Sequence, residues 1–269
     1  MADVEVSREG RVATVTLNRP EARNAVTRDM WAEIRDRLVE LSDNEGVGVV
    51  VLTGAAAPGD KQAFCAGGDV KDMAARLTGE RTHTVEEEAD YIREIVEASR
   101  LLHEMPKVTL AAINGAAAGA GLSLALACDL RIMVADSKLT TAFANIALSG
   151  DFGGGWFLSR IVGGAKAREL FYLAPTLTGE EAAAIGLVNR AAPRDAFDAA
   201  VRETAERIAS GPTSVLARMK ANFSDAERLP LSDYLAPEAR RMAESFRTED
   251  HREAAMAFVS KRAPHFKGK

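Results

Sequence analysis

The sequence predicts an α/β fold with parallel strands, followed by a helical C-terminal part, on three observations. Short apolar segments typical of buried strands alternate with longer amphipathic segments typical of helices up to about residue 165. Strand, helix and strand recur in that region, which is the order that builds a parallel sheet. Beyond it the strand patterns fade and helical patterns continue to the end of the chain.

The expected strands differ in how they are buried. Residues 12–17 alternate apolar and polar side chains, as in a half-buried strand. Residues 47–52 are continuously apolar, as in a strand covered on both faces. Two further strands are expected at 107–113 and 130–134.

The expected helices lie between and after these strands. One begins at about Thr27, and one near Thr84, where Thr84 and Glu87 form a capping-box pattern. A short helix is expected at 119–127. The helices of the C-terminal part are expected at 165–173, 179–185, 196–209, 213–224 and 234–261, the last with a break near Pro237. We therefore expect an α/β core at 1–200 and a helical region at 201–269.

Composition excludes several classes of protein. The chain has 269 residues, of which 47% are hydrophobic and 27% charged, as in an ordinary globular protein. A net charge of −5 argues against a nucleic-acid partner. The first ten residues do not form a secretory signal, and no apolar run approaches the ~20 residues of a membrane helix. Two distant cysteines and four histidines lack metal-ligand spacing, so we expect a cytoplasmic protein without a metal site.

The first chemical motif, FCAGGDV at 64–70, follows the second strand. Adjacent glycines permit a sharp turn whose successive N–H groups point into a cavity. The alternative is an ordinary glycine turn.

The second motif, NGAAAGAGLS at 114–123, links a strand to a helix. First-turn N–H groups have no partner inside a helix, and the helix dipole favours negative charge there. The run differs from a dinucleotide fingerprint because it lacks the third glycine. It also differs from a nucleophile elbow, because position 125 is alanine rather than glycine.

The third motif, SGDFGGGW at 149–156, places Asp151 among glycines and aromatic residues. Enclosure by Phe143, Phe152 and Trp156 would raise the pKa of its carboxyl, which suits a general base near neutral pH. The alternative is a turn aspartate that caps a helix.

Together, FCAGGDVK, AAINGAAAGAGLSLALACDLRI and GLVNRAAP resemble the crotonase superfamily, also called the enoyl-CoA hydratase/isomerase family. The similarity runs nearly end to end. It implies a spiral of ββα turns, with C-terminal helices that mediate trimers or dimers of trimers. It also implies an enzyme acting on acyl-CoA thioesters, with no cofactor beyond the coenzyme A (CoA) carried by the substrate.

The resemblance also implies site residues. Ala66 and Ala120 match the two backbone N–H donors that stabilise a thioester enolate. The CoA moiety would be met by basic and backbone groups and by one aromatic ring, namely Arg23, Ala66, Gly68, Asp69, Val70, Lys71, Lys261 and Phe258. Lys261 would act from a neighbouring subunit if the trimer forms.

The chain departs from the family's hydratases at both glutamate positions, which hold Ser123 and Phe143. Asp151 instead matches the acid of isomerase-type members, although Ser149-Gly150 replaces their usual apolar-proline pair. We therefore expect an enoyl-CoA isomerase that uses Asp151 as a single proton shuttle. The alternatives are a hydratase with an atypical water site and a non-catalytic CoA-binding or assembly protein.

Overall fold

The structure is a computed structural model that describes residues 2–57, 61–70, 73–74 and 84–269. Its main sheet has six strands in the order β1-β2-β3-β5-β7-β10. They are β1 (Val4–Glu9), β2 (Val12–Leu17), β3 (Val49–Gly54), β5 (Val108–Ile113), β7 (Leu130–Val134) and β10 (Arg190–Ala192). Only the β1–β2 hairpin is antiparallel, so the predicted parallel sheet is confirmed.

A second, smaller sheet has four strands in the order β4-β6-β8-β9. They are β4 (Ala63–Cys65), β6 (Ala116–Ala118), β8 (Lys138–Thr140) and β9 (Leu177–Thr178). Strands this short carry no readable periodicity, which is why patterning did not predict them. Their pairing matters for function: β4 and β6 run parallel, with Cys65 opposite Ala117. The two glycine-rich motifs therefore leave the sheet side by side.

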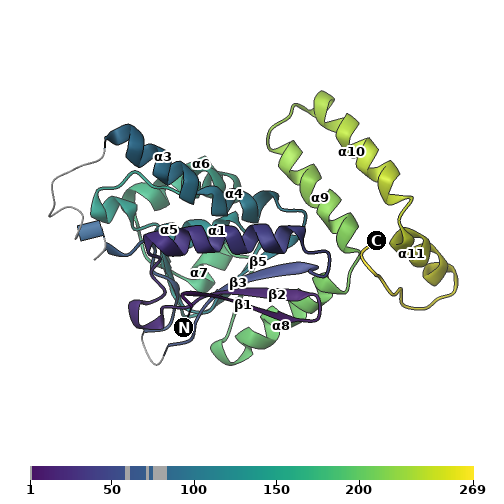
Figure 1. The fold of residues 1–269 in the computed structure, drawn as a ribbon, viewed down its shortest axis with the longest axis horizontal. Coiled ribbons are helices and arrows are strands. Elements are labelled where there is room, and N and C mark those ends of the chain that lie inside the picture. The colour runs from purple at the N-terminus through teal and green to yellow at the C-terminus, as the bar shows by residue number, and fades with distance from the viewer. Residues whose placement is uncertain (1, 58–60, 71–72, 75–83) are drawn as a thin grey trace.

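Helices cover both faces of the main sheet (Figure 1). On one side lie α1 (Arg28–Asp43), α3 (Val85–Ile95), α4 (Glu97–Glu104), α5 (Ala120–Ala127) and α6 (Gly154–Leu173). On the other side α8 (Arg194–Ala209) packs on the strands through Phe197 and Ala200. The remaining short elements are η1 (Pro20–Ala22), η3 (Phe143–Ile146) and α7 (Gly179–Ala184). The predicted capping box of Thr84 and Glu87 is confirmed at the start of α3.

Three helices extend away from the core as an arm: α9 (Thr213–Ala226), α10 (Leu231–Ser245) and α11 (Glu249–Val259) (Figure 1). The predicted break near Pro237 is wrong, because Pro237 lies inside α10. The chain turns instead after Phe246, where the Thr248 side chain accepts a hydrogen bond from the His251 N–H and starts α11. The side-chain cap, rather than the proline, sets the boundary here.

One buried lysine anchors the arm to the core. Lys220 of α9 donates hydrogen bonds to the carbonyl oxygens of Leu102 (2.8 Å) and Lys107 (2.9 Å). It also forms an ion pair with Asp129 at 2.8 Å, and Asp129 accepts hydrogen bonds from the Thr109 N–H and hydroxyl. A buried ammonium that satisfies all three of its donors fixes the base of the arm.

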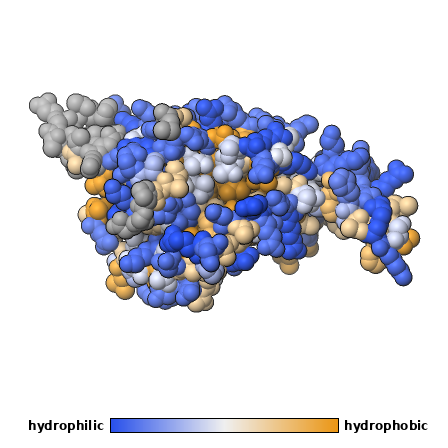
Figure 2. Space-filling view, turned by 90° about the horizontal axis from the view of Figure 1, so that it is seen from below, coloured by the Kyte–Doolittle hydropathy of each residue, from blue (hydrophilic) through white to orange (hydrophobic). Residues whose placement is uncertain are grey.

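The arm itself exposes large apolar side chains. They include Phe223, Leu231, Phe246 and Phe258, and Figure 2 shows apolar surface on this part of the molecule. Among the described residues, none of the helices combines the length and apolar character that a membrane span requires. Exposed apolar surface of this extent is typical of a contact between proteins.

Candidate active site

The loop after β4 lies directly against the segment that enters α5. Gly67 adopts a positive φ of 94°, and a Cβ atom there would lie 2.9 Å from the Ala118 carbonyl oxygen and 3.5 Å from the Ala120 nitrogen. A side chain at position 67 would therefore separate the two segments. Glycine is required for both the φ value and the close approach.

The Ala66 N–H group is engaged within the fold, which contradicts the prediction that it is a free donor. It donates to the Arg23 carbonyl oxygen at 3.1 Å. The Asp69 N–H donates to the Val26 carbonyl oxygen at 3.1 Å, in the short parallel bridge between 26 and 68. Between these two residues, the Gly68 N–H has no acceptor among the described residues. Gly68, unlike Ala66, thus has an available N–H group.

The second predicted donor, Ala120, is the first residue of α5. Gly119 before it has φ 51° and ψ −126°, a conformation that L-residues avoid. This turn leaves the Ala120 N–H at the helix N-terminus, with no acceptor among the described residues. Its nitrogen lies beside Gly67, so the Ala120 N–H group adjoins the loop that carries the Gly68 N–H group. Whether they bind an enolate oxygen stays a prediction.

Asp151 lies in the loop that joins η3 to α6, in apolar surroundings. Its Oδ1 atom is buried and has no hydrogen-bond partner among the described residues. Burial raises the pKa of the Asp151 carboxyl to about 6, because the charged form loses solvation. Phe152 beside it is fully buried and packs on Trp31 of α1, with ring centroids 4.1 Å apart. The carboxyl is therefore suited to accept and release a proton near neutral pH.

Phe143 connects the Asp151 loop to the segment before α5. A Cβ atom at Gly119 would lie 3.9 Å from the Phe143 ring, and one at Gly150 would lie 3.7 Å from it. The same ring stacks on Phe171, with centroids 5.8 Å apart and an interplanar angle of 13°. The position where the resemblance places a second glutamate is thus filled by a packed ring.

Ser123, at the other glutamate position, does not present a free hydroxyl. Its Oγ donates to the Gly119 carbonyl oxygen at 3.3 Å and lies against Gly154 at the start of α6. The side chain is buried between the two helices. Through Phe143 and Ser123, the segment that holds Asp151 therefore adjoins the start of α5, where the Ala120 N–H group lies.

The predicted CoA-binding residues fall into two groups. Arg23 lies against the loop after β4, since its carbonyl accepts the Ala66 N–H, and Asp69 forms an ion pair with Arg19 at 3.0 Å. Val70 is exposed next to them. Lys71 lies outside the described residues.

Phe258 and Lys261 form the second group. Phe258 is at the end of α11 with 85% of its surface exposed, and Lys261 follows it. Figure 1 shows α11 at the far end of the arm, opposite the end of the core that holds α5. Within one chain, the structure does not bring these two residues to the site.

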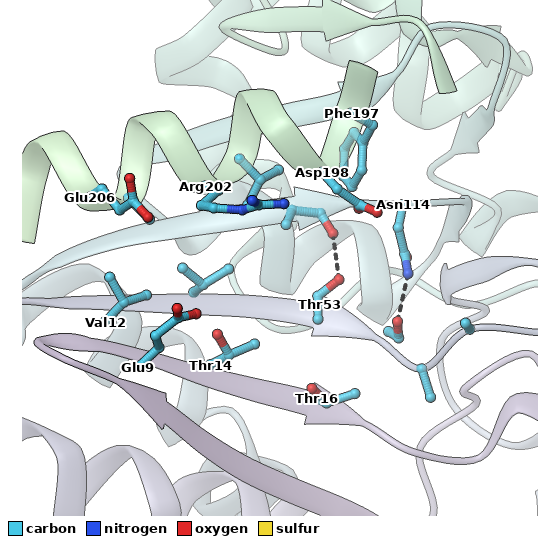
Figure 3. A pocket seen from close by; sticks show the side chains of 17 residues that line it. Glu9, Val12, Thr14, Thr16, Thr53, Asn114, Phe197, Asp198, Arg202 and Glu206 are labelled. Atoms are coloured by element: carbon cyan, nitrogen blue, oxygen red, sulfur yellow. Dashed lines mark hydrogen bonds between the residues drawn. The ribbon is translucent and has the colours of Figure 1, made fainter. Parts of the chain in front are cut away.

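A separate hollow of about 530 Å³ lies between α8 and the strands β2 and β3. Figure 3 shows Arg202 of α8 above Thr14 and Thr53 of the strands, with Asn114 donating a hydrogen bond to the Gly54 carbonyl oxygen. None of the predicted catalytic residues lines it. Because α8 and α5 cover opposite faces of the sheet, this hollow is distinct from the Asp151 site.

The fold thus brings together two segments with available backbone N–H groups, and one carboxyl oxygen of Asp151 is buried in the loop before α6. A family model described as "Enoyl-CoA hydratase/isomerase" matches residues 7–269, and the chain belongs to that family. The resemblance predicted from the three motifs is therefore confirmed.

Some relatives of this chain are named as hydratases and others as isomerases. The chain is 38% identical to a "Probable enoyl-CoA hydratase" of Rhodobacter capsulatus, over 96% of this chain and 95% of the relative. It is 33% identical to the "1,2-epoxyphenylacetyl-CoA isomerase" of Escherichia coli, over 97% of each chain. The crystal structure of an enoyl-CoA hydratase from Bacillus anthracis matches with a TM-score of 0.90, at 29% identity over 100% of both chains. The predicted crotonase fold with a helical C-terminal region is thereby confirmed.

Sequence reasoning missed two features of the site. Gly68 was assigned from the sequence to a turn and to the CoA site but not to the role of a backbone N–H donor. The signal that could have indicated this role is its place as the second of two adjacent glycines. Trp31 was missed as a wall of the Asp151 site. Its place on the apolar stripe of α1, beside Met30 and Ile34, indicated burial but not a partner 121 residues away in the chain.

Proposed function

We propose that this protein moves the double bond of an enoyl-CoA thioester, with Asp151 as the group that removes and returns the proton. The observation that carries the proposal is the buried, unpaired Oδ1 atom of Asp151, whose carboxyl has its pKa raised to about 6. Such a group is ionised enough at neutral pH to act as a base and basic enough to hold the proton.

The negative charge that forms on the thioester oxygen needs stabilisation. The Gly68 and Ala120 N–H groups are available and lie on adjoining segments. Backbone donors held by the fold require no reorganisation during the reaction, and one such donor is typically worth about 3–4 kcal/mol of barrier.

One carboxyl suffices because no water is consumed. Asp151 takes a proton from one carbon of the acyl chain, and the two electrons of that C–H bond move into the dienolate. The protonated carboxyl then delivers the proton two carbons away, and the double bond shifts. The reaction is redox-neutral and needs no cofactor beyond the CoA carried by the substrate. The Phe143 ring, packed between Gly119 and Gly150, leaves no second acid there to activate water.

The proposal includes the CoA site and the assembly. Arg23 and the backbone of 66–70 adjoin the donors and are proposed to meet CoA. Phe258 and Lys261 are proposed to complete this site from a neighbouring subunit of a trimer or a dimer of trimers. The exposed apolar side chains of the arm support such a contact. A cytoplasmic location is proposed as well, because Cys65 and Cys128 are free buried thiols.

The test is an assay of purified protein with 3-hexenoyl-CoA and 2-hexenoyl-CoA, read by mass spectrometry. We expect the 3-enoyl compound to become the 2-enoyl compound without a gain of water mass. Asp151→Asn should lower this conversion by roughly two to four orders of magnitude. The matched control Ser123→Ala should retain it, because that hydroxyl hydrogen-bonds to Gly119, the residue before α5. Addition of water to the 2-enoyl compound would overturn the proposal in favour of a hydratase.

A further inference from the structure

Arg28, the first residue of α1, is a half-buried arginine with no anionic partner among the residues that the structure describes. Its Nε atom is buried and has no hydrogen-bond acceptor among the described residues. Its guanidinium group lies over the ring of Tyr91 from α3, with the central carbon 3.4 Å from the ring centroid. No ion pair of Arg28 occurs in the described part of the chain.

An arginine in this state is unusual. A guanidinium carries five N–H donors, and a buried donor is normally paired with an acceptor, which the Nε atom of Arg28 lacks among the described residues. The Tyr91 ring holds the guanidinium group in place by stacking. It does not accept hydrogen bonds from the N–H groups, which point outward in the plane of the guanidinium. Arg28 does not stabilise α1 either, because a positive charge at a helix N-terminus interacts unfavourably with the helix dipole. The group is therefore held in a fixed orientation with its donors available to a ligand.

The position of Arg28 relates it to both halves of the candidate active site. Two residues before it, the Val26 N–H donates to the Gly67 carbonyl oxygen at 2.9 Å, in the loop that carries the Gly68 donor. Three residues after it, Trp31 packs on Phe152 beside Asp151. Residues three apart in a helix share a face, so Arg28 and Trp31 project from the same side of α1.

We propose that Arg28 binds a carboxylate at the far end of the acyl chain, so that the preferred substrates are CoA thioesters of dicarboxylic acids. A planar guanidinium recognises a carboxylate through two parallel N–H···O bonds. The thioester lies at the Gly68 and Ala120 N–H groups, the reacting carbons lie at Asp151, and the chain beyond them extends along α1. This assignment rests on the proposed function, because that function places the thioester at the Gly68 and Ala120 N–H groups.

The CoA phosphates are the other anions that the substrate carries. They lie at the opposite end of the ligand from the acyl terminus, and the proposal assigns them to Arg23 and the backbone of 66–70. An experiment that varies only the acyl terminus separates the two sources of negative charge.

The test is calorimetric binding of saturated thioesters, which cannot isomerise. Glutaryl-, adipyl- and pimelyl-CoA are compared with pentanoyl-, hexanoyl- and heptanoyl-CoA, which match them in chain length. We expect at least one dicarboxylic thioester to bind about tenfold or more tightly than its neutral match, the usual scale of a charge-assisted contact. Arg28→Gln should remove this preference without changing the Kd of the neutral thioesters or of free CoA, and Arg28→Lys should keep part of it.

Two outcomes would overturn the inference. One is equal affinity within all three pairs in the unaltered protein. The other is an Arg28→Gln variant, folded by circular dichroism, that loses affinity equally for charged thioesters, neutral thioesters and free CoA, which would assign Arg28 to a phosphate. Since no turnover is measured, a protein that fails as an isomerase but keeps the preference would refute the proposed function alone.

Discussion

Replacing Asp151 by asparagine tests the site through stability as well as activity. The side chain keeps its shape but can no longer ionise. In the folded protein, burial raises the pKa of this carboxyl from 3.8 to about 6, so folding opposes its ionisation. A group of this kind destabilises the fold wherever it is charged in the unfolded chain.

The size and sign of the effect follow from that shift. Below about pH 4 the carboxyl is protonated in both states and costs nothing. Between about pH 4 and 6 the unfolded chain ionises first, and stability falls as the pH rises; above about pH 6 the full cost applies. A shift of about two units corresponds to roughly 3 kcal/mol. Since the side chain is only partly enclosed, we expect about 1–3 kcal/mol.

The assay is urea denaturation of both proteins between pH 4 and pH 8. The free energy of unfolding of Asp151→Asn should rise relative to the parent protein as the pH increases through 4–6 and stay higher above it. Asp198→Asn, an exposed position on α8, is the matched control and should show no such trend. Turnover of the parent should rise as the pH passes about 6, and the asparagine variant should lose roughly two to four orders of magnitude. A stability difference that does not change with pH would refute the assignment of a buried ionising group.

Further predictions concern the fold around the site. Gly119→Ala should lower the free energy of unfolding by about 1–3 kcal/mol and reduce turnover, because φ 51° with ψ −126° is strained for alanine; urea denaturation and the enoyl-CoA assay measure both. Lys220→Met should cost roughly 3 kcal/mol by leaving Asp129 without its ion partner, and adding Asp129→Asn should restore part of it. Iodoacetamide should leave Cys65 and Cys128 unmodified in the native protein at pH 8, since burial raises the pKa of both thiols to about 12; peptide mass spectrometry detects any labelling.

The main sheet was predictable because its signals are local. Residues 12–17 and 130–134 form β2 and β7 at the predicted bounds, since apolar alternation or continuity depends on neighbours in the chain. The Thr84 and Glu87 capping box formed for the same reason. Pro237 shows the limit of such rules: an expected break became the interior of α10, and the side chain of Thr248 set the real boundary.

The candidate site also has some features that follow from local sequence and others that depend on distant segments. By itself the sequence determined the three motifs, the family, and Asp151 as the candidate acid, because each is a matter of residue type and spacing. Only the tertiary structure decided which backbone donor is available. Ala66 and Gly68 are two residues apart, and their N–H groups differ only in whether the chain at 23–26 accepts a hydrogen bond from them. That segment lies about 40 residues earlier in the chain; it accepts the Ala66 N–H and leaves the Gly68 N–H available. Hydrogen-bond partners between distant segments have no local signature, so packing alone reveals them.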